Sequence, residues 1–228
     1  MRDSETADQP PRNPSLARAI REAFPRYVDE IVLFTVVNLL WALAVGLFAF
    51  ARIGLPAVVV LTPLLALPTA ALMRLAVAAG RDRAPTWRMA REELGRLAGR
   101  KIVLATVQLL VLGFSLTNVL LGGSIGGLAG IASAIVAGYA LIAVTVYAVA
   151  LWPIVCDPAR EAPVRDQLRL ALALVTLRPV QLVVLAVITV LGVVVSIQLI
   201  VPMLFLPSLV LITIAGYVVP VADRVRPA

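Results

Sequence analysis

The sequence predicts an all-α fold, a polytopic transmembrane helical bundle of about six spans with short amphipathic helices on its cytoplasmic side. Of the 228 residues, 61% are hydrophobic and 14% are charged, whereas soluble domains average nearer half apolar and a quarter charged. Several apolar runs reach the roughly 20 residues that a helix needs to cross about 30 Å of hydrocarbon. Nearly all charged residues fall between these runs, and a chain of this length could not bury so much apolar surface in one soluble core.

A polar N-terminal region precedes the first apolar run. Residues 1–14 are rich in proline and charge, so we expect a disordered cytoplasmic tail followed by a single transmembrane domain over residues 15–228. Residues 15–27 carry an apolar helical face with arginines around it, which predicts a helix lying on the membrane surface. No signal-peptide pattern is found before the first span, so that span is expected to act as an uncleaved anchor.

The first two spans are predicted at residues 31–50 and 55–79. Pro63 and Pro68 are expected to kink or interrupt the second span, because proline lacks the N–H of the helical hydrogen bond. Together with Thr69, these prolines mark the best local candidate for an ion site built from backbone carbonyls. A purely structural kink is the preferred interpretation.

Spans three and four are predicted at residues 102–121 and 124–155, after a strongly basic loop. The loop, residues 80–101, holds seven Lys and Arg residues. Within it an apolar residue recurs at helical spacing, at Trp87 and onward, which predicts an amphipathic helix at the membrane interface.

Spans five and six are predicted at residues 180–201 and 203–221, after a polar connector with a helix over residues 166–177. Only Pro202 separates the last two apolar runs, so a single broken helix is the alternative. That alternative gives five spans and places the C-terminal arginines outside the cell, which makes six spans the preferred prediction.

The distribution of positive charge predicts the orientation. Of the 20 Lys and Arg residues, all but Arg52 fall on the side that carries both termini in the six-span layout. Because positive residues stay on the cytoplasmic side, both termini are expected in the cytoplasm of a bacterium, with the chain in its cytoplasmic membrane. The net charge of +7 is then expected to serve orientation and contact with lipid headgroups rather than nucleic-acid binding.

A series of glycines spaced by four residues begins at the end of span three. Gly122, Gly126 and Gly130 continue to Gly138 after an alanine, so one helical face would be smooth enough for another helix to approach closely. We expect a packing face within the chain plus a turn, and a homodimer seam is the alternative. The run lacks the lysine of a phosphate-binding loop.

Amide side chains occur within the apolar spans. Asn38 and Trp41 lie three residues apart and so project from one side of span one. An amide in hydrocarbon needs a partner, and hydrogen bonding between helices usually supplies it. The alternative is that the amides line a polar path for a hydroxylated substrate; the further candidates are Gln108, Asn118, Gln181 and Gln198.

The composition argues against an enzyme. Histidine is absent, so the usual catalytic dyads and the zinc ligands of membrane proteases cannot form. Cys156 is the single cysteine and has no base beside it in the sequence, which favours a structural thiol. No cofactor or metal site is predicted, and no span contains the carboxylate that ion-coupled transporters usually place at the membrane midplane.

Three short motifs resemble a known family. They are Asn-Leu-Leu-Trp at residues 38–41, Leu-Pro-Thr-Ala-Ala-Leu-Met-Arg at 67–74, and the Arg-Pro entry into a span at 178–179. With the basic loop between them, they are similar to the YesL-like family of bacterial integral membrane proteins, catalogued as domain of unknown function 624. The resemblance covers most of residues 30–222. It implies no established biochemical activity. Because members are often encoded beside carbohydrate ABC-transport and glycoside-hydrolase genes, it implies an accessory role in sugar uptake.

The expected function follows from the absence of a catalytic site and the presence of a basic surface. We expect a non-enzymatic protein that assists or regulates a transport system, with ABC-transporter subunits as partners. Its docking surface would be residues 81–101 with residues 160–178, centred on Arg88, Arg91 and Arg96. The alternative function is an autonomous transporter or channel for a small solute.

Overall fold

The computed structural model describes residues 15–50, 55–95, 98–160 and 162–225. These residues form helices joined by short connections, and no strand occurs among them. The predicted tail, residues 1–14, and the predicted docking residue Arg96 lie outside the described residues. The all-α prediction is confirmed.

Each predicted span corresponds to a helix, and so does each predicted amphipathic segment. The elements in chain order are α1 (Leu16–Asp29), α2 (Ile31–Phe50), α3 (Leu55–Gly80), α4 (Trp87–Gly95), α5 (Ala98–Ile125), α6 (Gly127–Val155), η1 (Pro158–Arg160), α7 (Val164–Leu177), α8 (Pro179–Gln198), α9 (Ile200–Met203) and α10 (Leu206–Arg224).

Within the described residues, four helices are long and apolar enough to cross a membrane: α5, α6, α8 and α10. The count rises to five if α1 and α2, which meet at a bend of 97°, form one broken span. The number of spans is below the predicted six partly because only Leu65–Gly80 of α3 enters this count. That part alone is shorter than a crossing needs. The chain is therefore a multi-pass helical membrane protein.

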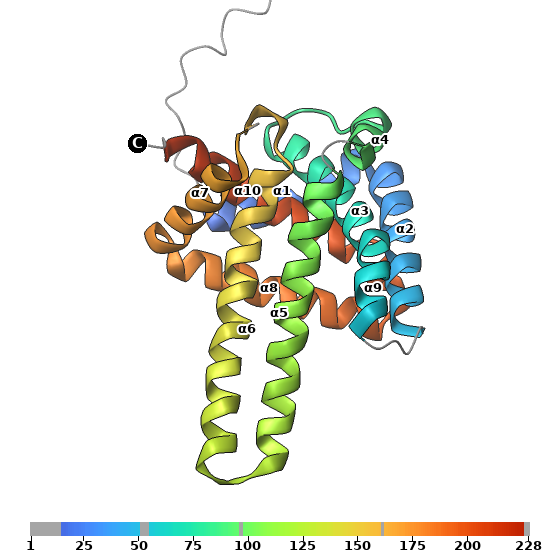
Figure 1. Cartoon of the computed structure of the whole chain (residues 1–228). Coiled ribbons are helices and arrows are strands. Elements are labelled where there is room, and N and C mark those ends of the chain that lie inside the picture. Colours follow the sequence, from blue (N-terminus) through green and yellow to red (C-terminus); the bar gives the residue numbers. More distant parts are fainter. Residues whose placement is uncertain (1–14, 51–54, 96–97, 161, 226–228) are drawn as a thin grey trace, which may run out of the picture.

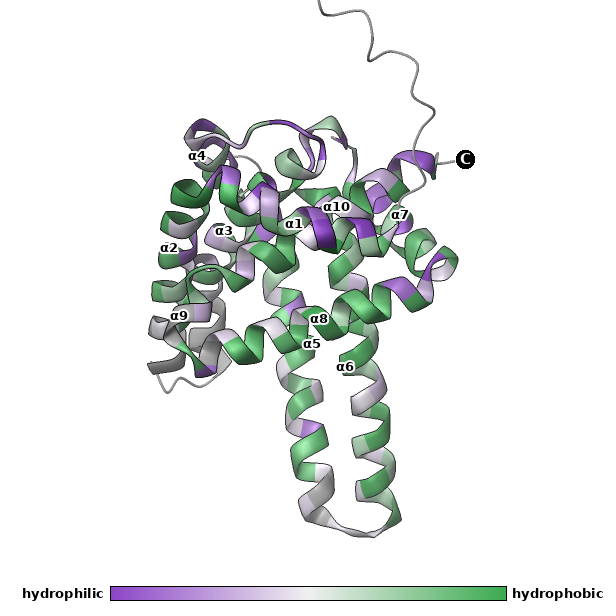
Figure 2. Ribbon diagram, turned by 180° about the vertical axis from the view of Figure 1, so that it is seen from behind, coloured by the Kyte–Doolittle hydropathy of each residue, from purple (hydrophilic) through white to green (hydrophobic). Residues whose placement is uncertain are grey.

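The helices form a broad bundle from which one hairpin extends. Helices α5 and α6 pack along each other and reach well beyond the rest of the molecule (Figure 1). Both views show α8 running across this pair rather than alongside it (Figures 1 and 2). Hydrophilic residues gather at the end that carries α1, α4, α7 and the end of α10, whereas the hairpin is largely hydrophobic (Figure 2). The molecule thus has one polar end and a long apolar body.

The core is built around the second half of α3. Ala70, Leu75 and Ala76 are fully buried there, and α10 packs along this face. Small residues let the two backbones approach closely: a Cβ added at Gly80 would lie 3.2 Å from the carbonyl carbon of Ala215. Helix α1 covers α10 from the other side.

Two expected boundaries are corrected. Helix α6 begins at Gly127 rather than at residue 124, because Gly126 and Gly127 have φ angles of 70° and 68° and make the turn of the hairpin. The break between the last two apolar runs extends over several residues instead of falling at Pro202 alone. Leu199 is extended (φ −128°, ψ 123°), α9 is a single turn, and α10 starts at Leu206, so the two long helices are separate.

Candidate functional site

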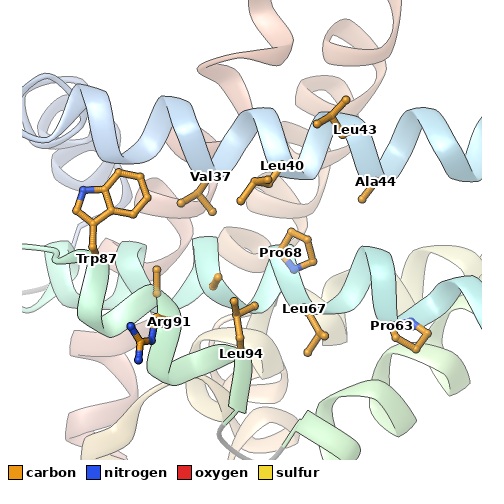
Figure 3. Close-up of a pocket in the computed structure, with 12 residues that line it drawn as sticks. Val37, Leu40, Leu43, Ala44, Pro63, Leu67, Pro68, Trp87, Arg91 and Leu94 are labelled. Atoms are coloured by element: carbon orange, nitrogen blue, oxygen red, sulfur yellow. The ribbon is translucent and has the colours of Figure 1, made fainter.

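Among the described residues, an apolar groove lies between α2, α3 and α4. It has a volume of about 460 Å³. Val37, Leu40 and Ala44 face it from α2, and Pro68 lies between the helices (Figure 3). The full lining is Val37, Leu40, Leu43, Ala44, Pro63, Leu67, Pro68, Ala71, Trp87, Ala90, Arg91 and Leu94. We refer to these residues as the α2–α4 groove.

The α4 end of the groove is where apolar and charged chemistry meet. Trp87, Ala90 and Leu94, the residues whose spacing predicted this helix, all line it. Arg91 adds the groove's one formal charge, and among the described residues no carboxylate pairs with it. The groove therefore presents an apolar floor with a guanidinium at its rim.

The prolines of α3 shape the groove without interrupting the helix. Pro63 and Pro68 were expected to kink or break the span, yet α3 continues through both as one helix. The hydroxyl of Thr69 donates a hydrogen bond of 2.7 Å to the carbonyl of Leu65. Each proline removes one N–H from the helix ladder, a loss that membrane helices tolerate. The expected interruption at Pro63 and Pro68 is therefore not observed, and the ion site at these prolines and Thr69 stays a prediction.

Helix α4 has only nine residues and is held in place by a buried ion pair. The carboxylate of Glu93 accepts a hydrogen bond from the ammonium of Lys101, and each side chain is only 2% exposed. The buried face of α4 also includes Ala90. A buried pair is costly to break from either side, so it fixes the position of α4 relative to α5.

The same buried region contains the thiol of Cys156. Burial raises its pKa well above the usual value, and the neighbouring Glu93 raises it further. A thiol with a raised pKa stays protonated and is a poor nucleophile. Cys156 is thus a structural residue, as its sequence context favoured.

A second ionic cluster joins the polar ends of α3, α6 and α10. The guanidinium of Arg81 donates to the fully buried carboxylate of Asp157, with Nε 3.2 Å from each carboxylate oxygen, and also to Asp223 at 3.2 Å. Arg160 adds a 2.5 Å contact to Asp223 and lies 3.7 Å from Asp157. Two arginines and two aspartates therefore close this end of the bundle.

The amides proposed as a polar path bond to different parts of the chain. Asn38 donates to the carbonyl of Leu204 at 2.8 Å. Gln108 accepts from the indole of Trp152 at 2.8 Å, and Asn118 donates within its own helix. The structure does not bring these amides together.

Trp41 finds its partner on α3. Its indole donates to the hydroxyl of Thr69 at 3.1 Å, so two residues singled out from the sequence meet there. Asn38, on the same side of α2, contacts the region between α9 and α10 instead. Asn38 and Trp41 thus bind α2 to two different neighbours, the segment between α9 and α10 and helix α3.

The predicted glycine face is only partly used. A Cβ at Gly122 would lie 2.6 Å from the carbonyl oxygen of Gly130 and 2.9 Å from the Cβ of Ala134. By contrast, nothing lies within 4 Å of a Cβ at Gly126, which forms the turn, or at Gly138. The packed face of α6 passes through Ala137 instead of Gly138, because helical faces recur at mixed steps of three and four residues. Gly138 therefore lies outside the packing face within the chain, and its place in a homodimer seam stays a prediction.

The basic residues of the predicted docking surface differ in their surroundings. Arg88 is highly exposed and donates to Glu92 on its own helix at 2.6 Å. Arg91 is exposed at the groove. On α7, Arg165 and Arg169 line a second shallow groove with Tyr147 and Leu172. The surface is therefore formed by short helices along the polar end.

Sequence reasoning missed the ionic residues that build this end. Lys101 is the only lysine of the chain, and a lone lysine at the start of an apolar run was a usable signal for a buried pair. Asp157 and Asp223 lie just beyond the predicted spans 124–155 and 203–221, and the sequence pattern assigned them no role. No group of metal-ligating side chains occurs within residues 15–50, 55–95, 98–160 and 162–225. No protein-family model, curated protein or solved structure matches the chain.

Proposed function

We propose that the chain is a non-enzymatic accessory or regulatory component of a membrane transport system, and that it docks its partner through α4 and α7. The observation that carries the proposal is the construction of α4. Glu93 anchors its inner face through a buried ion pair, while Arg88 and Arg91 point outward and remain exposed. The two arginines are balanced by Glu92 and Glu93, so α4 has no net charge. Because the helix is fixed in position, the exposed guanidiniums of Arg88 and Arg91 can meet an acidic partner surface at low entropic cost.

The proposal includes an orientation. The polar end with α1, α4 and α7 would face the cytoplasm of a bacterium, with both termini on that side of the cytoplasmic membrane. The basis is the positive-inside rule, since all but one of the 20 Lys and Arg residues belong to that side in the six-span layout.

The partner class rests on the resemblance to the YesL-like family. It implies ABC-transporter subunits, in a system for carbohydrate uptake. An autonomous transporter or channel has less support, because the amides that would line its path bond to the chain at separate places.

The test is affinity purification from native membranes in mild detergent, followed by mass spectrometry. We expect transporter subunits in a fixed ratio, and their loss in the double variant Arg88→Glu/Arg91→Glu. The variant Arg21→Glu, an exposed arginine on α1, should retain them. Recovery of the chain alone would overturn the proposal. Solute flux in liposomes that contain only this protein would establish the alternative.

A further inference from the structure

We propose that the α2–α4 groove binds an anionic phospholipid, with one acyl chain along α2 and α3 and its phosphate at Arg91. The inference shares Arg91 with the proposed docking function but does not rest on it, because it concerns a lateral site that the bilayer itself can fill. Three observations carry it: the length of the groove, its position between the polar end and the apolar body, and the charge at its rim.

The length of the groove suits an acyl chain. Along α2 the lining extends from Val37 to Ala44, which is about 10 Å at 1.5 Å per residue. That length covers most of the roughly 15 Å of hydrocarbon in one leaflet.

The walls remain apolar and uncovered where the lipid would lie. Leu40 and Leu43 are 53% and 58% exposed, although they sit beside a buried core. Exposed leucines on a membrane helix are satisfied by hydrocarbon. The groove therefore receives an acyl chain without displacing any contact of the described residues.

The residues at the rim of the groove would recognise the lipid headgroup. Arg91 lines the groove and has no carboxylate partner among the described residues, whereas its neighbour Arg88 is paired with Glu92. A guanidinium binds phosphate oxygens through two parallel N–H donors. Trp87, half exposed at the same rim, is the residue type that concentrates at the depth of the lipid headgroups.

The test uses the purified full chain, delipidated in detergent and then mixed with defined lipids, with native mass spectrometry counting the lipids retained. We expect dioleoyl-phosphatidylglycerol to be retained and dioleoyl-phosphatidylcholine to be retained roughly ten-fold less, because the two differ in charge and share their chains. Glycerol phosphate, a headgroup without chains, should not be retained. Equal retention of both lipids, or retention of glycerol phosphate, would overturn the proposal.

Paired variants locate the site. Arg91→Gln should reduce phosphatidylglycerol retention about ten-fold, while Arg21→Gln, an exposed arginine on α1 outside the lining, should leave it unchanged. Leu40→Trp should fill the groove and reduce retention similarly, while Leu39→Trp, exposed on the same helix and absent from the lining, should not. The Arg91 pair alters exposed side chains only, so it decides the matter even if Leu40→Trp misfolds. Equal effects within either pair of folded variants would contradict the assignment.

Discussion

The ammonium of Lys101 and the carboxylate of Glu93 form an ion pair with almost no solvent contact, each side chain being 2% exposed. The pair joins α4 to the start of α5 across the connection that follows Gly95. Because α4 supplies both Trp87 and Arg91 to the groove, the position of the site depends on this contact.

Breaking the pair from one side should destabilise the protein strongly. Glu93→Gln or Lys101→Met alone removes one member of the buried ion pair, a change that typically costs about 3–5 kcal/mol. The double variant Glu93→Gln/Lys101→Met removes both charges and should recover much of that loss. Unfolding in a denaturing-detergent titration measures all three; a double variant no more stable than the worse single variant would refute the coupling.

Removing Asp157 should weaken the polar end of the bundle more than removing Asp223. Asp157 is fully buried and faces both Arg81 and Arg160, whereas the side chain of Asp223 is 45% exposed. Asp157→Asn is expected to cost about 3 kcal/mol of unfolding free energy and Asp223→Asn about 1 kcal/mol or less. The same titration measures the stability of both variants. A larger loss for Asp223→Asn than for Asp157→Asn would show that the exposed Asp223 holds the cluster together.

Alkaline pH should destabilise the protein through Cys156. Burial, and then Glu93, raise the pKa of this thiol well above 9.0. As pH rises past the unfolded pKa, the unfolded chain loses a proton that the folded chain keeps, so the unfolding free energy falls until the folded pKa is reached. Cys156→Ala should flatten this part of the stability profile above about pH 9. An unchanged slope in that variant would assign the pH dependence to other groups.

The reactivity of the same thiol offers an independent check. Cys156 is 1% exposed, so a membrane-permeant maleimide at neutral pH should label it slowly in the folded protein and rapidly after unfolding. Rapid labelling of the folded protein would show that the region around Glu93 opens readily.

The two ends of the glycine series should respond differently to an added methyl group. Gly122→Ala places a Cβ 2.6 Å from a backbone carbonyl oxygen of α6, so the hairpin must open and we expect a loss of about 1–3 kcal/mol. Gly138→Ala meets nothing within 4 Å and should be neutral or stabilising by up to about 1 kcal/mol, from helix propensity. Equal effects would mean that α5 and α6 are not packed as described.

The local sequence pattern predicted the helices well because each membrane segment is an apolar run of its own with polar residues at its ends. The apolar runs and their polar ends located α2, α3, α5, α6, α8 and α10 to within several residues. The start of α6 was less accurate, since the glycine-rich residues 122–127 are compatible with either helix or turn until the positive φ angles of Gly126 and Gly127 are known.

The groove could not be predicted, because its walls come from three helices and its shape depends on how they pack. Trp87 and Arg91 were identified from their spacing and charge, but nothing local to them indicates Leu40 or Pro68 as neighbours. The partner of Asn38 is a backbone carbonyl 166 residues away. Hydrogen bonds to a carbonyl carry no signature in the side-chain sequence, so such contacts appear only in the folded chain.

The most direct test of the proposed docking function is photo-crosslinking in native membranes from a photoreactive residue placed at Arg88. The account predicts a discrete adduct with a subunit of a transport system from this position, and none from Leu120, which is 67% exposed on the apolar hairpin. Crosslinking of lipid alone from both positions would contradict the proposal that α4 docks a partner.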